Sequence, residues 1–200
     1  MKKLFLLFLP LLSILLFSSC EYDFNSDFVY DFDSKVNEIE NYTGRDINEV
    51  VDKLKDENLH VESNINGIIS MTDYNGSVVY VLYPSSNNKI EEVRFEYYTS
   101  TPSVALDYYG IWHNSAYDLN YTKYYHGEIT YLNYNKYNYN DEFNFIENFN
   151  DYGPDIYNCN EEWENNYNGC SIEYQILDLS NRRVSINCYK LYKKSLNKRK

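Results

Sequence analysis

One amphipathic helix followed by three short strands is the feature that most constrains the fold of this chain. Apolar residues recur at helical spacing within residues 46–58, and Asp46 stands at the N-cap position. Three strands are expected next, at residues 68–73, 77–83 and 90–97. Asn75-Gly76 between the first two is a strong signal for a hairpin. This order predicts an α+β fold with helices packed on an antiparallel sheet.

The same order of elements begins again after residue 100. Thr101-Pro102 is typical of a helix start, and an apolar stripe continues to Trp112. A strand is expected at residues 128–133, whereas residues 143–149 have no clear assignment. A hairpin of residues 171–177 and 184–191 closes the chain. We therefore expect one α+β domain, residues 42–192, made of two possible units, 42–100 and 101–192.

Two flanking segments differ from this domain in composition. Residues 20–41 interleave acidic and aromatic side chains without a helical period, and we expect an acidic-aromatic tether there. Residues 181–200 hold eight Lys or Arg and no acid. Their end, residues 193–200, forms a basic tail that either attracts an anionic surface or is a solvated terminus.

The first twenty residues have the three parts of an export signal. Two lysines precede an apolar run, residues 4–17, and Ser18-Ser19 lead directly into Cys20. This stretch resembles the precursor of a bacterial lipoprotein, although Phe17 stands where that family usually has Leu. The resemblance implies that signal peptide 1–19 is removed, that Cys20 carries lipid, and that the protein lies in the cell envelope, facing the periplasm or the cell surface. An ordinary secretory signal and a retained span are the alternatives.

Residues 42–97 carry a second resemblance. The matching positions are Gly44, Val50 and Leu54, with Asp46 where a Thr is usual and with Lys55 and Glu57 where a Gly and a Pro close the motif. In this spacing the segment resembles the helix-plus-sheet module of small outer-membrane assembly lipoproteins and β-lactamase-inhibitor-like proteins. The resemblance implies a fold and assigns no functional residue.

Tyrosine and asparagine dominate the composition, with 24 Tyr and 27 Asn in 200 residues. Aromatic faces stack on sugars and amides bond hydroxyls, which suggests glycan binding, but codon bias of an AT-rich genome explains the same enrichment. The densest run lies within residues 121–140 and makes Tyr131, Tyr134 and Tyr137 candidate ligand contacts. The net charge of −12 argues against a nucleic-acid partner.

Motifs for catalysis, cofactors or metals are not found in the sequence. It has no nucleophile elbow and no phosphate-binding glycine loop. The three histidines, His60, His113 and His126, lack metal-ligand spacing, and we expect surface or satisfied core residues. A weak, irregular cation site at Glu161, Glu162 and Glu164 stays open. We expect no enzyme, no cofactor and no metal.

Three cysteines remain besides Cys20, namely Cys159, Cys170 and Cys188. A bond between Cys159 and Cys170 would close the polar loop between them and is the first candidate. A Cys170–Cys188 bond across the closing hairpin is the second. Three reduced thiols are the third possibility.

Taken together, these features predict a membrane-anchored envelope protein with a non-catalytic domain that binds another envelope protein. A glycan-binding surface module is the alternative, and a hydrolase is the least expected. An open sheet edge would favour a protein partner, clustered exposed tyrosines would favour a glycan, and a pocket with converging acids would favour an enzyme.

Overall fold

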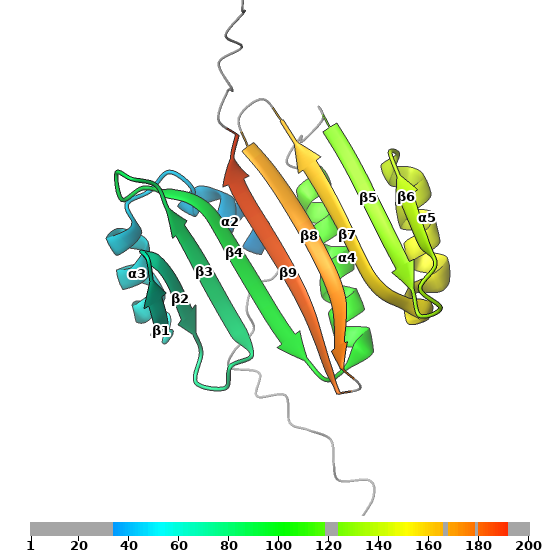
Figure 1. The fold of residues 1–200 in the computed structure, drawn as a ribbon, viewed down its shortest axis with the longest axis horizontal. Helices are drawn as coiled ribbons and strands as arrows, with labels where there is room; N and C mark the ends of the chain where they lie inside the picture. The colour runs from blue at the N-terminus through cyan, green and yellow to red at the C-terminus, as the bar shows by residue number, and fades with distance from the viewer. Residues whose placement is uncertain (1–33, 119–123, 166–167, 179, 192–200) are drawn as a thin grey trace, which may run out of the picture. The chain divides into compact units, whose positions relative to one another are not determined.

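Four α-helices and a nine-stranded antiparallel sheet make up the described residues, 34–118, 124–165, 168–178 and 180–191, of a computed structural model (Figure 1). The helices are α2 (Lys35–Tyr42), α3 (Ile47–Asp56), α4 (Pro102–Asp118) and α5 (Glu142–Tyr152), and a short 3-10 helix, Gly153–Asp155, follows α5. The strands are β1 (His60–Ile65), β2 (Ile68–Thr72), β3 (Val78–Pro84), β4 (Ile90–Thr99), β5 (Tyr124–Tyr131), β6 (Lys136–Tyr139), β7 (Ile156–Glu164), β8 (Asn168–Asp178) and β9 (Asn181–Lys190). The predicted α+β class is confirmed.

The strand order of the sheet is β1-β2-β3-β4-β9-β8-β7-β5-β6. Strands β1 to β4 form one meander and β7 to β9 another, and they meet where β4 pairs with β9, from Glu92–Tyr189 to Thr99–Arg182. The two predicted units therefore share one continuous sheet. The two units differ in the order of their elements, because in the second unit α5 stands between the β5–β6 hairpin and β7 in the chain. That hairpin pairs with β7 through β5 and so extends the sheet beyond β7.

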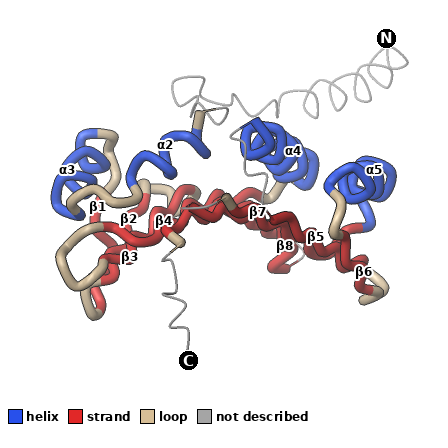
Figure 2. Tube along the Cα trace, turned by 90° about the horizontal axis from the view of Figure 1, so that it is seen from above, coloured by secondary structure: helices blue, strands red, loops and turns tan. Residues whose placement is uncertain are grey.

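All four helices lie on the same face of the sheet (Figure 2). Helices α2 and α4 pack on the central strands, and α5 packs on β5. The fully buried rings of Phe95 on β4 and Trp112 on α4 meet edge to face with centroids 5.7 Å apart. On the other face, Arg183 binds the carboxylates of Glu96 and Glu173. None of the described helices is both long and apolar enough to cross a bilayer.

The elements with the strongest sequence patterns lie where they were predicted. Asp46 caps α3 by accepting a hydrogen bond from the backbone N–H of Asn48 at 2.9 Å, and the apolar stripe of α3 is buried. Helix α4 begins at Pro102. The closing hairpin also lies where it was predicted, with Ile172 facing Ile186 and Tyr174 facing Val184, and all four side chains are buried.

The tether prediction is wrong for its last residues, because α2 occupies residues 35–42. Val36 and Ile39 are fully buried, and Tyr42 is nearly so. These three apolar residues at intervals of three form a stripe that is too short to stand out beside the acidic-aromatic alternation before it. Residues 20–33, Cys20 included, and the basic tail 193–200 lie outside the described residues.

Besides α2, four elements were missed, namely β1, β6, α5 and β7, and one strand was displaced. Strand β1 has a bulge and mostly exposed side chains, so its sequence shows little alternation. Helix α5 fills the stretch that had no assignment. The strand expected at residues 128–133 runs instead over Tyr124–Tyr131, and Leu132-Asn133 forms the turn that follows.

Candidate functional site

Helix α5 has one face that packs against the sheet and a neighbouring face that lines a pocket. Asp141 caps the helix by accepting hydrogen bonds from the backbone N–H groups of Phe143 at 2.8 Å and Asn144 at 3.3 Å. Phe145 and Phe149, four residues apart, form the buried stripe. Asn148 and Tyr152 are also four residues apart and lie on a neighbouring face of the helix. This second pair lines a pocket.

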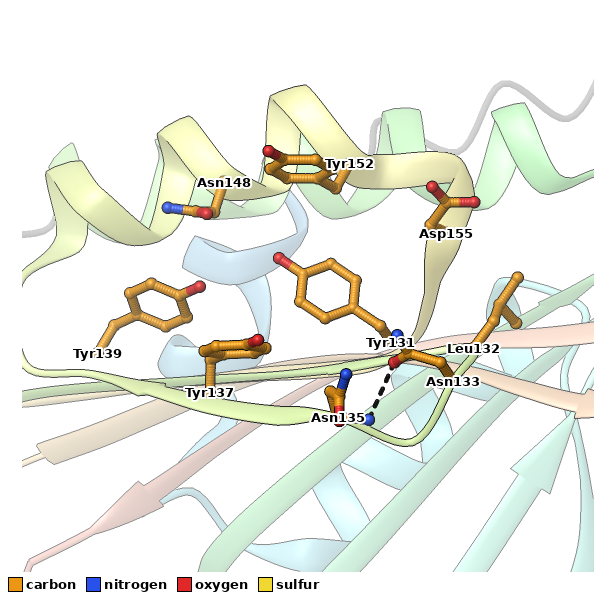
Figure 3. Close-up of a pocket in the computed structure, with 9 residues that line it drawn as sticks. All are labelled: Tyr131, Leu132, Asn133, Asn135, Tyr137, Tyr139, Asn148, Tyr152 and Asp155. Carbon is orange, nitrogen blue, oxygen red and sulfur yellow. Dashed lines mark hydrogen bonds between the residues drawn. The ribbon is translucent and has the colours of Figure 1, made fainter.

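The opposite wall of the pocket comes from the β5–β6 hairpin. Strand residues alternate between the two faces of a sheet, so Tyr137 and Tyr139 lie on one face. Tyr137 is paired with the buried Ile129, which places both tyrosines on the helix-covered face. In the turn, Asn133 accepts a hydrogen bond from the backbone N–H of Asn135 at 3.0 Å (Figure 3). The hairpin thus presents a row of rings to α5.

Between these walls lies a pocket of about 520 Å³, here called the tyrosine pocket. Figure 3 shows side chains from α5 pointing towards those of the hairpin. The nine described residues around it include one carboxylate and no cationic side chain. They are Tyr131, Leu132, Asn133, Asn135, Tyr137, Tyr139, Asn148, Tyr152 and Asp155.

Tyr131 contacts two other rings of the tyrosine pocket. Its ring meets Tyr137 edge to face with centroids 5.6 Å apart, and Tyr152 in the same manner at 5.9 Å. Partial burial raises the pKa of the Tyr131 hydroxyl well above its usual value, and its hydrogen bond with Tyr139 acts in the same direction. The hydroxyl therefore stays protonated and can both donate and accept hydrogen bonds.

The structure brings together two of the three tyrosines predicted as ligand contacts. Tyr131 and Tyr137 line the pocket, but Tyr134 lies apart, because it is 77 % exposed and its ring packs near Tyr157 at 5.9 Å. Asn148 and Tyr152 were missed because α5 was not assigned. The signal for that helix was present in the Asp141 cap and in the spacing of Phe145 and Phe149.

A buried polar cluster lies on the helix-covered face beside α5. Glu161 on β7 is fully buried and accepts hydrogen bonds from the hydroxyls of Tyr109 at 2.6 Å and Tyr125 at 2.8 Å. His113 Nδ1 lies 3.0 Å from both Glu161 oxygens, and its Nε2 lies 3.4 Å from Glu142 on α5. We call these five residues the Glu161 cluster.

Two opposing effects act on His113. Burial disfavours the charged imidazolium, but the hydrogen bond with Glu161 and the charges of Glu161 and Glu142 outweigh it, so the pKa is raised above the usual 6.5. Burial also raises the pKa of Glu142. The cluster joins α4, α5, β5 and β7, and it makes His113 a satisfied core residue, as was expected of the histidines.

The acidic residues of β7 do not converge on a cation. Glu161 points into the core, whereas its neighbour Glu162 lies on the opposite face and accepts a hydrogen bond from Tyr189 at 2.5 Å. Glu164 shares the face of Glu162 because the strand alternates. Among the described residues no group of His, Cys, Asp and Glu is placed to hold a metal ion. The irregular cation site at these three glutamates is therefore wrong.

The cysteines lie differently from the first pairing predicted. Cys170 faces Trp163 on β7, while Cys159 faces Tyr174, four positions further along β8. Four positions correspond to about 13 Å along a strand, so a Cys159–Cys170 bond does not fit this register. Cys170 instead lies directly opposite Cys188. All three thiols are buried, and none of them forms a disulfide in the structure.

No protein-family model, curated protein sequence or solved structure matches this chain. The resemblance of the first twenty residues to lipoprotein precursors, and that of residues 42–97 to the assembly-lipoprotein module, stay predictions. The geometry of the tyrosine pocket is therefore the main basis for assigning a function.

Proposed function

We propose that this chain is a lipid-anchored protein of the bacterial cell envelope whose α+β domain binds a saccharide in the tyrosine pocket. The observation that carries the proposal is the composition of that pocket, in which four tyrosine rings and three asparagine amides face one space. These residues come from the β5–β6 hairpin and from α5, and the fold brings the two segments together.

The chemistry of the lining matches that of a sugar. A pyranose ring has apolar C–H faces, which pack on tyrosine rings, and a rim of hydroxyls, which both donate and accept hydrogen bonds. Asparagine amides offer donors and an acceptor, and neutral tyrosine hydroxyls offer both. The volume of about 520 Å³ lies within the range of small-molecule sites. A short saccharide therefore fits the site in size and in bonding.

Other ligand classes fit the tyrosine pocket less well. Phosphate recognition relies on Arg, Lys or helix N-termini, and the described lining contains no cation, while Asp155 would repel an anion. Hydrolysis of a glycosidic bond normally uses a pair of carboxylates, and the lining supplies one. These features support binding without catalysis.

Substitution of the two most exposed rings tests the site. Tyr137 and Tyr152 are 50 % and 49 % exposed, so Tyr137→Ser and Tyr152→Ser should leave Tm nearly unchanged. Each should weaken saccharide binding about three- to tenfold, because one aromatic contact is worth about 1 kcal/mol. An array of saccharides probed with wild-type protein identifies the ligand, and titration calorimetry then gives Kd for each variant.

Tyr74→Ser is the matched control, because Tyr74 is 84 % exposed in the turn between β2 and β3, away from the pocket. It should leave Kd unchanged. Wild-type protein that binds no saccharide contradicts the proposal, and binding that survives both pocket substitutions places the ligand elsewhere.

A protein partner is the second candidate, and one observation favours it. Strand β1 is an edge of the sheet, with Val61 and Ile65 exposed, and Ile68 beside them at the start of β2 is exposed as well. An open edge with apolar side chains can add a strand from another chain. Capture of an envelope protein that is unaffected by Tyr137→Ser and Tyr152→Ser would support this candidate.

The lipid anchor is tested separately. The tripartite signal ending in Ser18-Ser19-Cys20 motivates it. Metabolic labelling with a fatty-acid analogue should mark the wild-type chain, and Cys20→Ser should abolish the label. Undiminished label in the Cys20→Ser protein would remove the lipid anchor from the proposal. Cys159→Ser, a change at another cysteine, controls for loss of a thiol as such.

A further inference from the structure

Two buried thiols face each other across the central strands of the sheet. Cys170 on β8 and Cys188 on β9 are directly opposed, and their sulfur atoms lie 3.6 Å apart. Directly opposed residues of an antiparallel pair have Cα atoms about 4.5–5.5 Å apart, and disulfides form across about 4.4–6.8 Å. The backbone therefore already has the separation that a disulfide needs.

The surroundings of this pair are apolar on both sides. Trp163 on β7 lies opposite Cys170, and Val93 on β4 lies opposite Cys188, so the four side chains form one row across the sheet. All four are at most 2 % exposed. A disulfide has no N–H or O–H to satisfy, so it adds no unpaired polar group to this row, in which the indole N–H of Trp163 already lacks a hydrogen-bond partner.

We propose that Cys170 and Cys188 form a structural disulfide that links β8 to β9, with Cys159 left as a free thiol. The oxidant is another disulfide, such as a thiol–disulfide oxidoreductase or oxidised glutathione. One cysteine thiolate attacks it and expels a thiolate, giving a mixed disulfide. The second cysteine thiolate then attacks the mixed disulfide and expels the other half of the oxidant as a thiolate. The chain loses two protons and two electrons, and the oxidant becomes two thiols.

The closed fold hinders this exchange, so the bond should form before the sheet is complete. The Cys188 thiol has a pKa well above its usual value, because it forms a hydrogen bond with Cys170 and is buried. A protonated thiol is a poor nucleophile. We therefore expect rapid oxidation during refolding and slow oxidation of the folded, reduced protein.

Refolding of the full chain with oxidised and reduced glutathione tests the proposal. After denaturation and alkylation without reductant, peptide mapping should show Cys170 joined to Cys188 and a label on Cys159. The linked protein should melt about 5 °C above the reduced protein, since closing a loop of this length stabilises it.

Two variants make the test specific. Cys159→Ala should keep the link and its rise in Tm, whereas Cys188→Ala should lose both. Three alkylated thiols after oxidative refolding of the wild-type chain, or a link that includes Cys159, would overturn the proposal. Mapping of protein isolated from the envelope then shows whether the bond is present where the protein works, and three free thiols there would overturn its structural role.

Discussion

Replacing Glu161 with alanine is expected to destabilise the fold by about 3–5 kcal/mol, the range measured when one partner of a buried ion pair is removed. Glu161 accepts hydrogen bonds from Tyr109 and Tyr125 and pairs with His113. The alanine leaves the buried Tyr109 and His113 and the partly buried Tyr125 without this acceptor. Denaturant unfolding, followed by circular dichroism, measures the loss.

Glu162→Ala is the matched control, because it removes the same side chain from the next position of β7. Glu162 lies on the opposite face, where it accepts one hydrogen bond from Tyr189. Its loss should therefore amount to about 0.5–1.5 kcal/mol. Equal losses for the two substitutions would contradict the assigned role of the Glu161 cluster.

The pH dependence of the free energy of unfolding tests the Glu161 cluster independently. The raised pKa of His113 means that the folded state binds a proton more tightly than the unfolded state does. This contribution to stability is present below pH 6.5 and is lost as the pH rises through the folded pKa. Glu142, whose pKa is raised from 4.5, acts with the same sign. The free energy of unfolding should thus fall as pH increases from about 5 to 8.

Glu161→Gln separates charge from hydrogen bonding in this measurement. The amide can still accept a hydrogen bond from a tyrosine hydroxyl but provides no negative charge for His113. The decrease in stability with pH should therefore become shallower than in the wild-type protein. A slope as steep as the wild type would show that Glu161 does not hold the proton on His113.

Adding one methyl group at Gly127 is the second change with a large expected effect. A Cβ atom there would lie 2.5 Å from the Phe145 ring and 2.6 Å from the Tyr125 hydroxyl. Phe145 is fully buried and cannot move aside without shifting α5. Gly127→Ala should therefore destabilise the fold by about 1–3 kcal/mol, the usual range for overpacking.

Gly110→Ala is the control for this change. Gly110 lies within α4, and a Cβ atom there would meet no other atom within 4 Å. Alanine is the better helix former, so this variant should gain about 0.5–1 kcal/mol. Thermal unfolding of both variants should move Tm in opposite directions. A Gly127→Ala protein as stable as the wild type would show that α5 does not depend on close approach to β5.

Because α5 also carries Asn148 and Tyr152, Gly127→Ala should weaken ligand binding in the tyrosine pocket as well. Saccharide titration of the folded variant would detect this effect.

Local hydrophobic patterns in the sequence were sufficient to predict a helix or strand where the pattern was long and regular. The stripe of α3 with its Asp46 cap, and the alternation in the β8–β9 hairpin, predicted the elements and their buried faces correctly. Helix α2 was missed because its two turns carry only three stripe residues and follow a segment with a different pattern. Strand β1 was missed because an edge strand with a bulge has no buried face to mark its register.

The amino-acid sequence by itself determined the α+β class, the antiparallel sheet and the richness in tyrosine and asparagine, because these follow from local periodicity and composition. Only the tertiary structure decided which side chains meet. Helix α5 crosses beside the β5–β6 hairpin and joins Tyr152 to Tyr131 and Tyr137, and the register of β8 and β9 places Cys170 against Cys188. Such contacts depend on strand order and register, which are set by how several elements share one core rather than by any single segment.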